Sequence, residues 1–201
     1  MYCFKNERSC VKYLREVMKK KYPKNTITSH RNIEKTFKAK WSKFFDELPP
    51  ATPEIDLVRG FKNREEQKMI EGIEVKYFWK AKTGRSYIEG FGQSLGLLLW
   101  GFDRVSLYHI FDYEFDETER KRFVRTSVEL SNRLSSITYR AFLARRDEEI
   151  KLFQLDNSGS ITEEGPSLHP GKFRNPFLKK IDNQIRRRKD FITTEILGFV
   201  P

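Results

Sequence analysis

Two short stretches decide the fold that this sequence predicts: Pro53-Glu54-Ile55-Asp56-Leu57-Val58 and, eighteen residues after Asp56, Glu74-Val75-Lys76. In both, apolar residues alternate with charged ones at a period of two, which predicts β-strands. On the second strand Glu74 and Lys76 are two residues apart, so their side chains project from the same face. If the two strands pair as a hairpin, Asp56 brings a second carboxylate to that place.

Two carboxylates and one ammonium on paired strands indicate metal-assisted attack on a phosphodiester. Asp56, Glu74 and the backbone carbonyl of Val75 offer the oxygen ligands that Mg²⁺ prefers. Lys76 would lie beside the attacking water, where an ammonium favours hydroxide and stabilises negative charge on the phosphate. The alternative is that both acids lie on the exposed face of a strand. The apolar residues around them favour burial instead, and a buried carboxylate needs a cation. Glu54, on the same strand face, is a rival to Asp56 as ligand.

Two further polar residues are candidates for the same site. Gln93 lies early in an expected helix among glycines and leucines, in Gly90-Phe91-Gly92-Gln93-Ser94-Leu95-Gly96. The glycines would let this helix approach the strands closely, so that the amide of Gln93 reaches the water or a phosphate. Glu7 lies in the first turn of an expected N-terminal helix, where the helix dipole by itself favours an acid. Structural roles for both residues therefore stay open.

In the order Glu, Asp, Glu-x-Lys and Gln on helix, strand, strand and helix, these residues resemble the PD-(D/E)XK nuclease superfamily. The helix that opens with Asn6-Glu7-Arg8 is similar to the opening helix of archaeal Holliday-junction resolvases. The likeness covers roughly residues 5–111. One departure concerns the proline, which in the family usually directly precedes the aspartate, whereas Pro53 is three positions ahead of Asp56.

The resemblance implies an α/β fold of the restriction-endonuclease-like kind, a mixed sheet of four or five strands flanked by helices. It implies metal-dependent hydrolysis of DNA, duplex or branched, with Asp56 and Glu74 holding Mg²⁺, or Mn²⁺ as a substitute. Lys76 would assist the water, Gln93 would orient water or phosphate, and Glu7 would support the site. A homodimer fits this activity because a duplex has two strands. Two alternatives stay open: a nuclease-like domain that binds nucleic acid without cutting, and a structural basic protein with an incidental motif.

The composition agrees with a folded, basic domain. Among 201 residues, 38% are hydrophobic and 14% aromatic, which is enough for a core, and the net charge of +11 favours a polyanionic partner. Nucleic acid is the expected partner and an anionic membrane surface the competitor. The longest apolar run, Leu95–Trp100, is far too short to span a bilayer. Two cysteines without further metal ligands predict free thiols in a reducing, cytoplasmic interior.

Hydrophobic periodicity and the positions of proline and glycine divide the rest of the chain into expected helices and strands. The expected helices cover residues 6–21, 32–47, 87–100, 116–134 and 176–190, and the expected strands residues 53–58, 69–79, 104–111, 137–143 and 149–155. Residues 1–155 are expected to form the nuclease-like domain, and residues 156–201 a basic C-terminal extension packed on it or appended to it. Basic runs such as Lys19-Lys20-Lys21 are either solvated helix faces or phosphate contacts. His109, inside an apolar strand, is expected to be structural.

Overall fold

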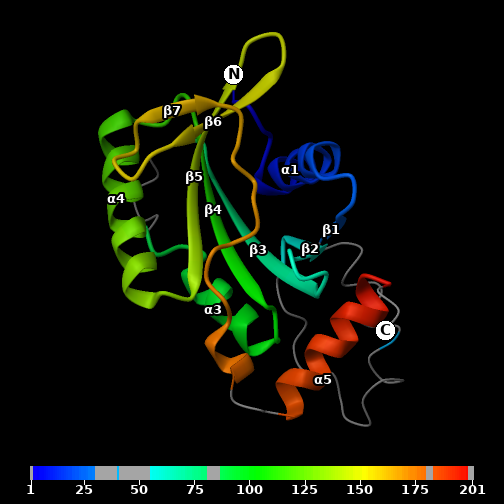
Figure 1. Ribbon diagram of the computed structural model, residues 1–201. Helices are drawn as coiled ribbons and strands as arrows, with labels where there is room; N and C mark the ends of the chain where they lie inside the picture. Colours follow the sequence, from blue (N-terminus) through cyan, green and yellow to red (C-terminus); the bar gives the residue numbers. More distant parts are fainter. Residues whose placement is uncertain (1, 30–39, 41–54, 81–86, 180–182, 199–201) are drawn as a thin grey trace.

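A computed structural model describes residues 2–29, 40, 55–80, 87–179 and 183–198 (Figure 1). The expected helix 32–47 and the rival ligand Glu54 lie outside the described residues, apart from residue 40. The helical elements are α1 (Glu7–Lys21), α3 (Phe91–Leu99), α4 (Glu117–Leu134), η1 (Pro176–Lys179), α5 (Asn183–Phe191) and η2 (Ile192–Ile196). The strands are β1 (Thr26–Ser29), β2 (Leu57–Lys62), β3 (Lys68–Phe78), β4 (Arg104–Asp112), β5 (Ile137–Arg146), β6 (Ile150–Leu155) and β7 (Ile161–Glu164).

The strands form one mixed sheet in the order β1-β2-β3-β4-β5-β6-β7. β3, β4 and β5 are parallel neighbours, joined through α3 and α4, and the outer pairs are antiparallel. The predicted α/β class, with a mixed sheet flanked by helices, is confirmed. The predicted number of four or five strands is wrong, because β1 and β7 add an edge strand on each side. Each has only four residues, too few for an alternation to stand out from a polar segment.

The hairpin of β2 and β3 is confirmed, with Leu57 opposite Ile73 and Gly60 opposite Ile70. The first strand begins later than predicted, so that Asp56 immediately precedes β2. Helix α3 likewise begins at Phe91, four residues after its expected start.

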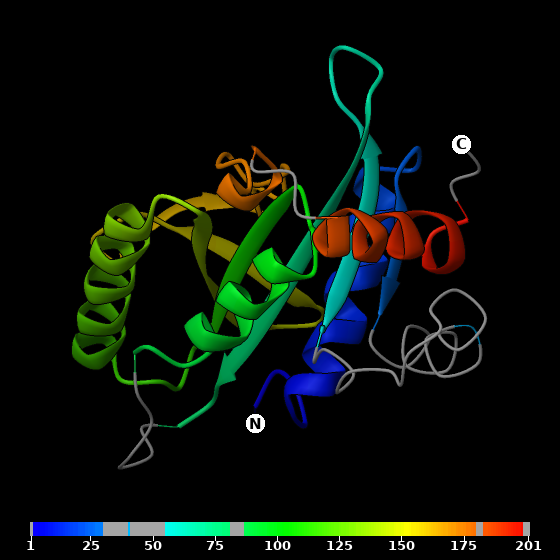
Figure 2. The ribbon, with the colours of Figure 1, turned by 90° about the horizontal axis from the view of Figure 1, so that it is seen from below.

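Helices cover both faces of the sheet. Figure 2 shows α3 and α5 on one side of the strands and α1 on the other. The alternation along β4 explains this division: Val105 and Leu107 pack in the cluster that α3 and α5 complete. Tyr108 and Ile110 pack instead in the cluster that α1 completes with Cys10, Leu14 and Met18. Because both faces are covered, β3 is buried along nearly its whole length, charged residues included.

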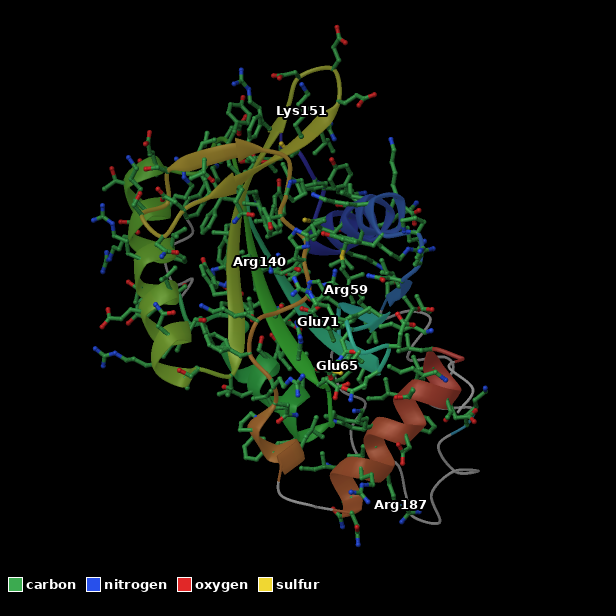
Figure 3. The ribbon with its side chains drawn as sticks, viewed as in Figure 1. Arg59, Glu65, Glu71, Arg140, Lys151 and Arg187 are labelled. Atoms are coloured by element: carbon green, nitrogen blue, oxygen red, sulfur yellow. The ribbon has the colours of Figure 1, made fainter. Side chains whose placement is uncertain are left out.

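Residues 165–175, here called the strap, cross the α1 side of the sheet between β7 and η1 (orange in Figure 1). Buried groups of the sheet bind the backbone of the strap. Arg59 donates to the carbonyl of Leu168 at 2.6 Å, and the carboxylate of Glu71 accepts from the N–H of Gly171 at 2.8 Å. Figure 3 shows Arg59, Glu71 and Arg140 along the strap, and Arg140 also donates to a strap carbonyl. This part of the C-terminal extension is therefore packed on the sheet.

Candidate active site

The candidate site lies where β2 and β3 separate. In the described part of the chain the ladder of β2 with β3 ends at Ile73, while β3 continues for five more residues. Beyond Ile73, carboxylates accept hydrogen bonds from backbone N–H groups of β3. Asp56 Oδ2 accepts from the N–H of Val75 at 2.8 Å, and Glu7 Oε2 accepts from the N–H of Tyr77 at 3.3 Å. Two of the predicted site acids are thus held by the backbone of the strand that carries the other site residues.

Glu74 and Lys76 project from the same face of β3, as their spacing predicts. Nζ of Lys76 lies 2.7 Å from Oε1 of Glu74 and 3.4 Å from Oε1 of Glu7. The side chain of Glu74 is 2% exposed and that of Lys76 is 10% exposed. Glu7 arrives from the first turn of α1, which packs on the opposite face, and reaches Lys76 past the edge of β3. The structure therefore brings Glu7, Asp56, Glu74 and Lys76 together.

The electrostatics of this cluster follow from burial and charge. Burial, followed by the negative charge of Asp56, raises the pKa of Glu74 to about 8, although Lys76 acts in the opposite direction. Burial alone would lower the pKa of Lys76, but the carboxylates of Glu74 and Glu7 outweigh it and raise that pKa above its usual value. Lys76 is therefore an ammonium near neutral pH, suited to stabilise anions rather than to accept a proton.

One oxygen of Glu74 carries the case for a cation. Oε2 is buried and has no hydrogen-bond partner among the residues that the structure describes. A buried carboxylate oxygen without a partner is costly, and a second carboxylate nearby, that of Asp56, makes a divalent cation a suitable partner. The carbonyl of Val75 shares this edge, because N–H and C=O of one strand residue point to the same side and its N–H binds Asp56. These donors fit the predicted Mg²⁺ ligands.

This donor set contains two carboxylates and one carbonyl. Across the described ranges, no group of three or more His, Cys, Asp and Glu side chains is arranged to hold a metal ion. Water molecules would complete the coordination sphere, which is usual for Mg²⁺ because it dehydrates reluctantly.

The turn before α3 packs directly on Lys76. Gly90 has a φ of +88°, and a Cβ there would lie 2.6 Å from Cδ1 of Leu107 and 3.2 Å from Cγ of Lys76. The expected close approach of α3 is therefore confirmed at Gly90. It is wrong for Gly92 and Gly96, where an added Cβ meets no described residue within 4 Å.

Gln93 lies in the first turn of α3, half-buried, at the helix end that packs on Lys76. The position agrees with the predicted one. Its role as a ligand of water or phosphate stays a prediction.

His109 is a neighbour of the site. The apolar sequence around it did not predict this position. It lies opposite Lys76 in the β3–β4 register and is fully buried. Its Nε2 lies 3.1 Å from the carbonyl oxygen of Glu89 and its Nδ1 lies 3.2 Å from the hydroxyl of Tyr139. Burial lowers the pKa of His109 to about 4, so the ring is neutral near pH 7. His109 thus connects β4, β5 and the turn that packs on Lys76.

No known protein family matches this chain, and neither curated proteins nor solved structures provide a match. The function of this chain is therefore inferred from the geometry of its site. Among the described helices, none has the length and apolar character needed to cross a bilayer. Cys3 and Cys10 are both buried free thiols.

Proposed function

We propose that this protein is a metal-dependent nuclease that hydrolyses phosphodiester bonds in DNA. The observation that carries the proposal is the buried Oε2 of Glu74, which lies beside Asp56 and has no hydrogen-bond partner among the residues described, with the ammonium of Lys76 on the other oxygen of Glu74. A buried carboxylate oxygen without a hydrogen-bond partner is costly, and binding of a cation would remove that cost.

The topology supports a restriction-endonuclease-like fold. Helix α1, the β2–β3 hairpin, α3 and β4 follow one another in the order that the resemblance implies. The site lies at the end of the hairpin where the strands separate, with α3 beginning directly over Lys76. The net charge of +11 supports a nucleic-acid substrate.

In this mechanism Asp56, Glu74 and the carbonyl of Val75 would hold Mg²⁺. When bound there, Mg²⁺ supplies Lewis-acid activation of water and neutralises charge on the phosphate. Lys76 remains an ammonium and stabilises the negative charge that develops on the phosphate as the water oxygen attacks phosphorus. The phosphorus–oxygen bond to the leaving strand breaks, and that oxygen takes up a proton. Glu7 holds Lys76 in place, and Gln93 orients the water or a phosphate oxygen.

The test is cleavage of supercoiled plasmid and of a four-way junction in Mg²⁺, Mn²⁺ or chelator. Wild type should cut in either metal ion and not in chelator. Asp56→Asn keeps an acceptor for the N–H of Val75, and Lys76→Met keeps the aliphatic stem, so both variants should fold. Both should lose cleavage while DNA binding in chelator stays close to wild type. Wild-type turnover in either purified variant would remove the assignment.

The second candidate is a nuclease-like domain that binds nucleic acid without cutting it. The observation in its favour is that Lys76 already neutralises much of the cluster, through Glu74 at 2.7 Å and Glu7 at 3.4 Å. This candidate predicts DNA binding that does not change with Mg²⁺ and no cleavage in either metal ion. The same plasmid and junction assays distinguish the two functions.

A further inference from the structure

Helix α1 carries a row of cations on its outer side. Lys12, Arg15 and Lys19 recur at spacings of three and four residues, which places them on one side of the helix. The opposite side is buried through Cys10, Leu14, Met18 and their neighbours. Lys12 and Lys19 are exposed and Arg15 is half-buried. We call Lys12, Arg15 and Lys19 the α1 row.

Among the described residues, the charges of the two lysines of this row are balanced only in part, through the nearby carboxylate of Glu16. Within the described residues neither Lys12 nor Lys19 forms an ion pair, and the exposed Glu16 pairs with Arg15 at 2.7 Å. The helix as a whole has six basic residues against two acidic ones.

Several cations of the other two basic helices, α4 and α5, are paired within the protein. Four cations of α4 pair with acids of the same helix: Arg120 with Glu117 at 3.8 Å, Lys121 with Glu117 at 2.7 Å, Arg122 with Glu119 at 3.7 Å and Arg133 with Glu129 at 2.5 Å. On α5, Lys189 pairs with Asp103 at 2.6 Å, and Arg188 donates to the carbonyl of Leu99 at 3.2 Å. The α1 row is therefore the better candidate for binding an anion from outside the protein.

The row also begins close to the candidate active site. Glu7, in the first turn of α1, contacts Lys76 and the N–H of Tyr77. Along the helix axis Lys19 lies about 18 Å from Glu7, which corresponds to about five base steps of a DNA strand. Glu7 lies on the side of α1 that faces the sheet and the row lies on the outer side, so a DNA backbone would leave the site past the edge of β3 and then follow the outer side of α1.

We propose that the α1 row binds the phosphate backbone of DNA next to the bond that is cleaved. This inference depends on the proposed function, and it names where the substrate lies. Lysine is a compact charge that binds phosphates without reading bases, so the contact is independent of sequence and weakens with salt. An anionic membrane fits less well, because no large apolar side chain of α1 is exposed, and a membrane-binding helix needs an apolar face.

The test compares Lys12→Gln/Lys19→Gln with the matched variant Arg122→Gln/Arg133→Gln, which removes the same charge from α4. Arg8 is left unchanged because it adjoins Glu7. Binding of the full chain to a labelled duplex and a labelled four-way junction is measured in chelator over a range of salt. Neutralising the two lysines of the row should weaken DNA binding about tenfold and lower the slope of log Kd against log salt by about 2. The α4 variant should stay close to wild type, and circular dichroism should show that all three proteins fold alike.

Equal losses of DNA affinity in both variants would mean that only the net charge of the protein matters. Unchanged affinity after neutralising the two lysines would mean that the α1 row does not contact DNA. Either result overturns the proposal. Vesicles rich in phosphatidylserine give the third arm. Binding to vesicles that is lost with the row, while DNA binding is kept, would assign the surface to membranes instead. Because binding is measured without cleavage, a failure of the nuclease assignment in the Asp56→Asn test remains distinguishable from a failure here.

Discussion

Nζ of Lys76 lies 2.7 Å from Oε1 of Glu74, while the other carboxylate oxygen of Glu74 is buried without a hydrogen-bond partner in the described part of the chain. The two oxygens of one carboxylate thus have different surroundings. One is neutralised by a neighbouring residue, and the other is the oxygen that would bind a cation in the proposed function. If the proposed function holds, a change at Glu74 should affect metal binding, and a change at Lys76 should affect the rate of cleavage without loss of metal binding.

Glu74→Gln should lose both Mn²⁺ binding and cleavage, because the amide replaces a charged oxygen ligand with a neutral group. Lys76→Met should bind Mn²⁺ at least as tightly as wild type, because a competing positive charge is gone. Its turnover should fall by about 10²–10³-fold, as expected when a group that stabilises charge in the transition state is removed. Calorimetric titration with Mn²⁺ and single-turnover cleavage measure the two effects. Equal Mn²⁺ affinity in wild type and Glu74→Gln would contradict the ligand role of Glu74.

Gly90→Ala should destabilise the protein and slow cleavage. The left-handed backbone at this position costs a residue with a Cβ about 1–2 kcal/mol, and the new methyl would lie 2.6 Å from Leu107 and 3.2 Å from the stem of Lys76. Gly92→Ala is the matched control, since its Cβ meets nothing within 4 Å. As a helical position it should gain about 0.5–1 kcal/mol. Urea unfolding and cleavage rates of both variants check this, and similar effects at the two positions would be the contrary result.

His109→Gln should reduce the acid sensitivity of the fold. The pKa of His109 is about 4 in the folded protein against an ordinary value of 6.5, so the unfolded chain binds the proton more tightly. Above pH 6.5, His109 therefore does not lower the free energy of unfolding. As the pH falls from 6.5 towards 4, it lowers the free energy of unfolding by an amount that grows to about 3 kcal/mol. Urea unfolding across this window should show wild type losing more stability than the variant. Parallel losses in the two proteins would show that His109 becomes charged without cost.

Arg59→Met should destabilise the protein by about 3–5 kcal/mol, because it leaves a charge without its partner in the interior. Both side chains of the Arg59–Glu71 pair are fully buried. The carboxylate of Glu71 would keep its bonds from Ser106 at 2.6 Å and Gly171 at 2.8 Å, but no cation. Adding Glu71→Gln removes the charge and keeps these acceptor bonds, so the double variant should cost less than the two single changes together.

A double-mutant cycle by urea unfolding measures this coupling. Lys62→Met provides the comparison, since Lys62 forms an exposed pair with Glu66, with side chains 60% and 76% exposed. Its loss should cost less than about 1 kcal/mol. Glu71 projects from the opposite face of β3 to Glu74, so folded Arg59→Met protein should cleave DNA at the wild-type rate. A similar cost for Lys62→Met and Arg59→Met would show that burial does not decide the strength of the pair.

Much of the sheet is predictable because its signals are local. The alternation along β3 correctly places Glu74 and Lys76 on one face, and the hairpin correctly brings Asp56 next to them. β1 and β7 were not predictable, because four-residue strands exist only through the neighbours with which they pair. Gly90 was expected to allow close approach, but Gly92 carries the same signal in the sequence and faces open space.

By itself the sequence determined which side chains share a strand face, because a period of two is a property of consecutive residues. Only the tertiary structure decided that Glu7 reaches Lys76 from 69 positions away. It also decided that His109 stands beside Lys76, through a parallel register set across α3. The tertiary structure likewise decided that Oε2 of Glu74 is buried with no hydrogen-bond partner in the part of the chain that is described. Burial and long-range pairing arise from the packing of whole elements, and no short pattern of residues records them.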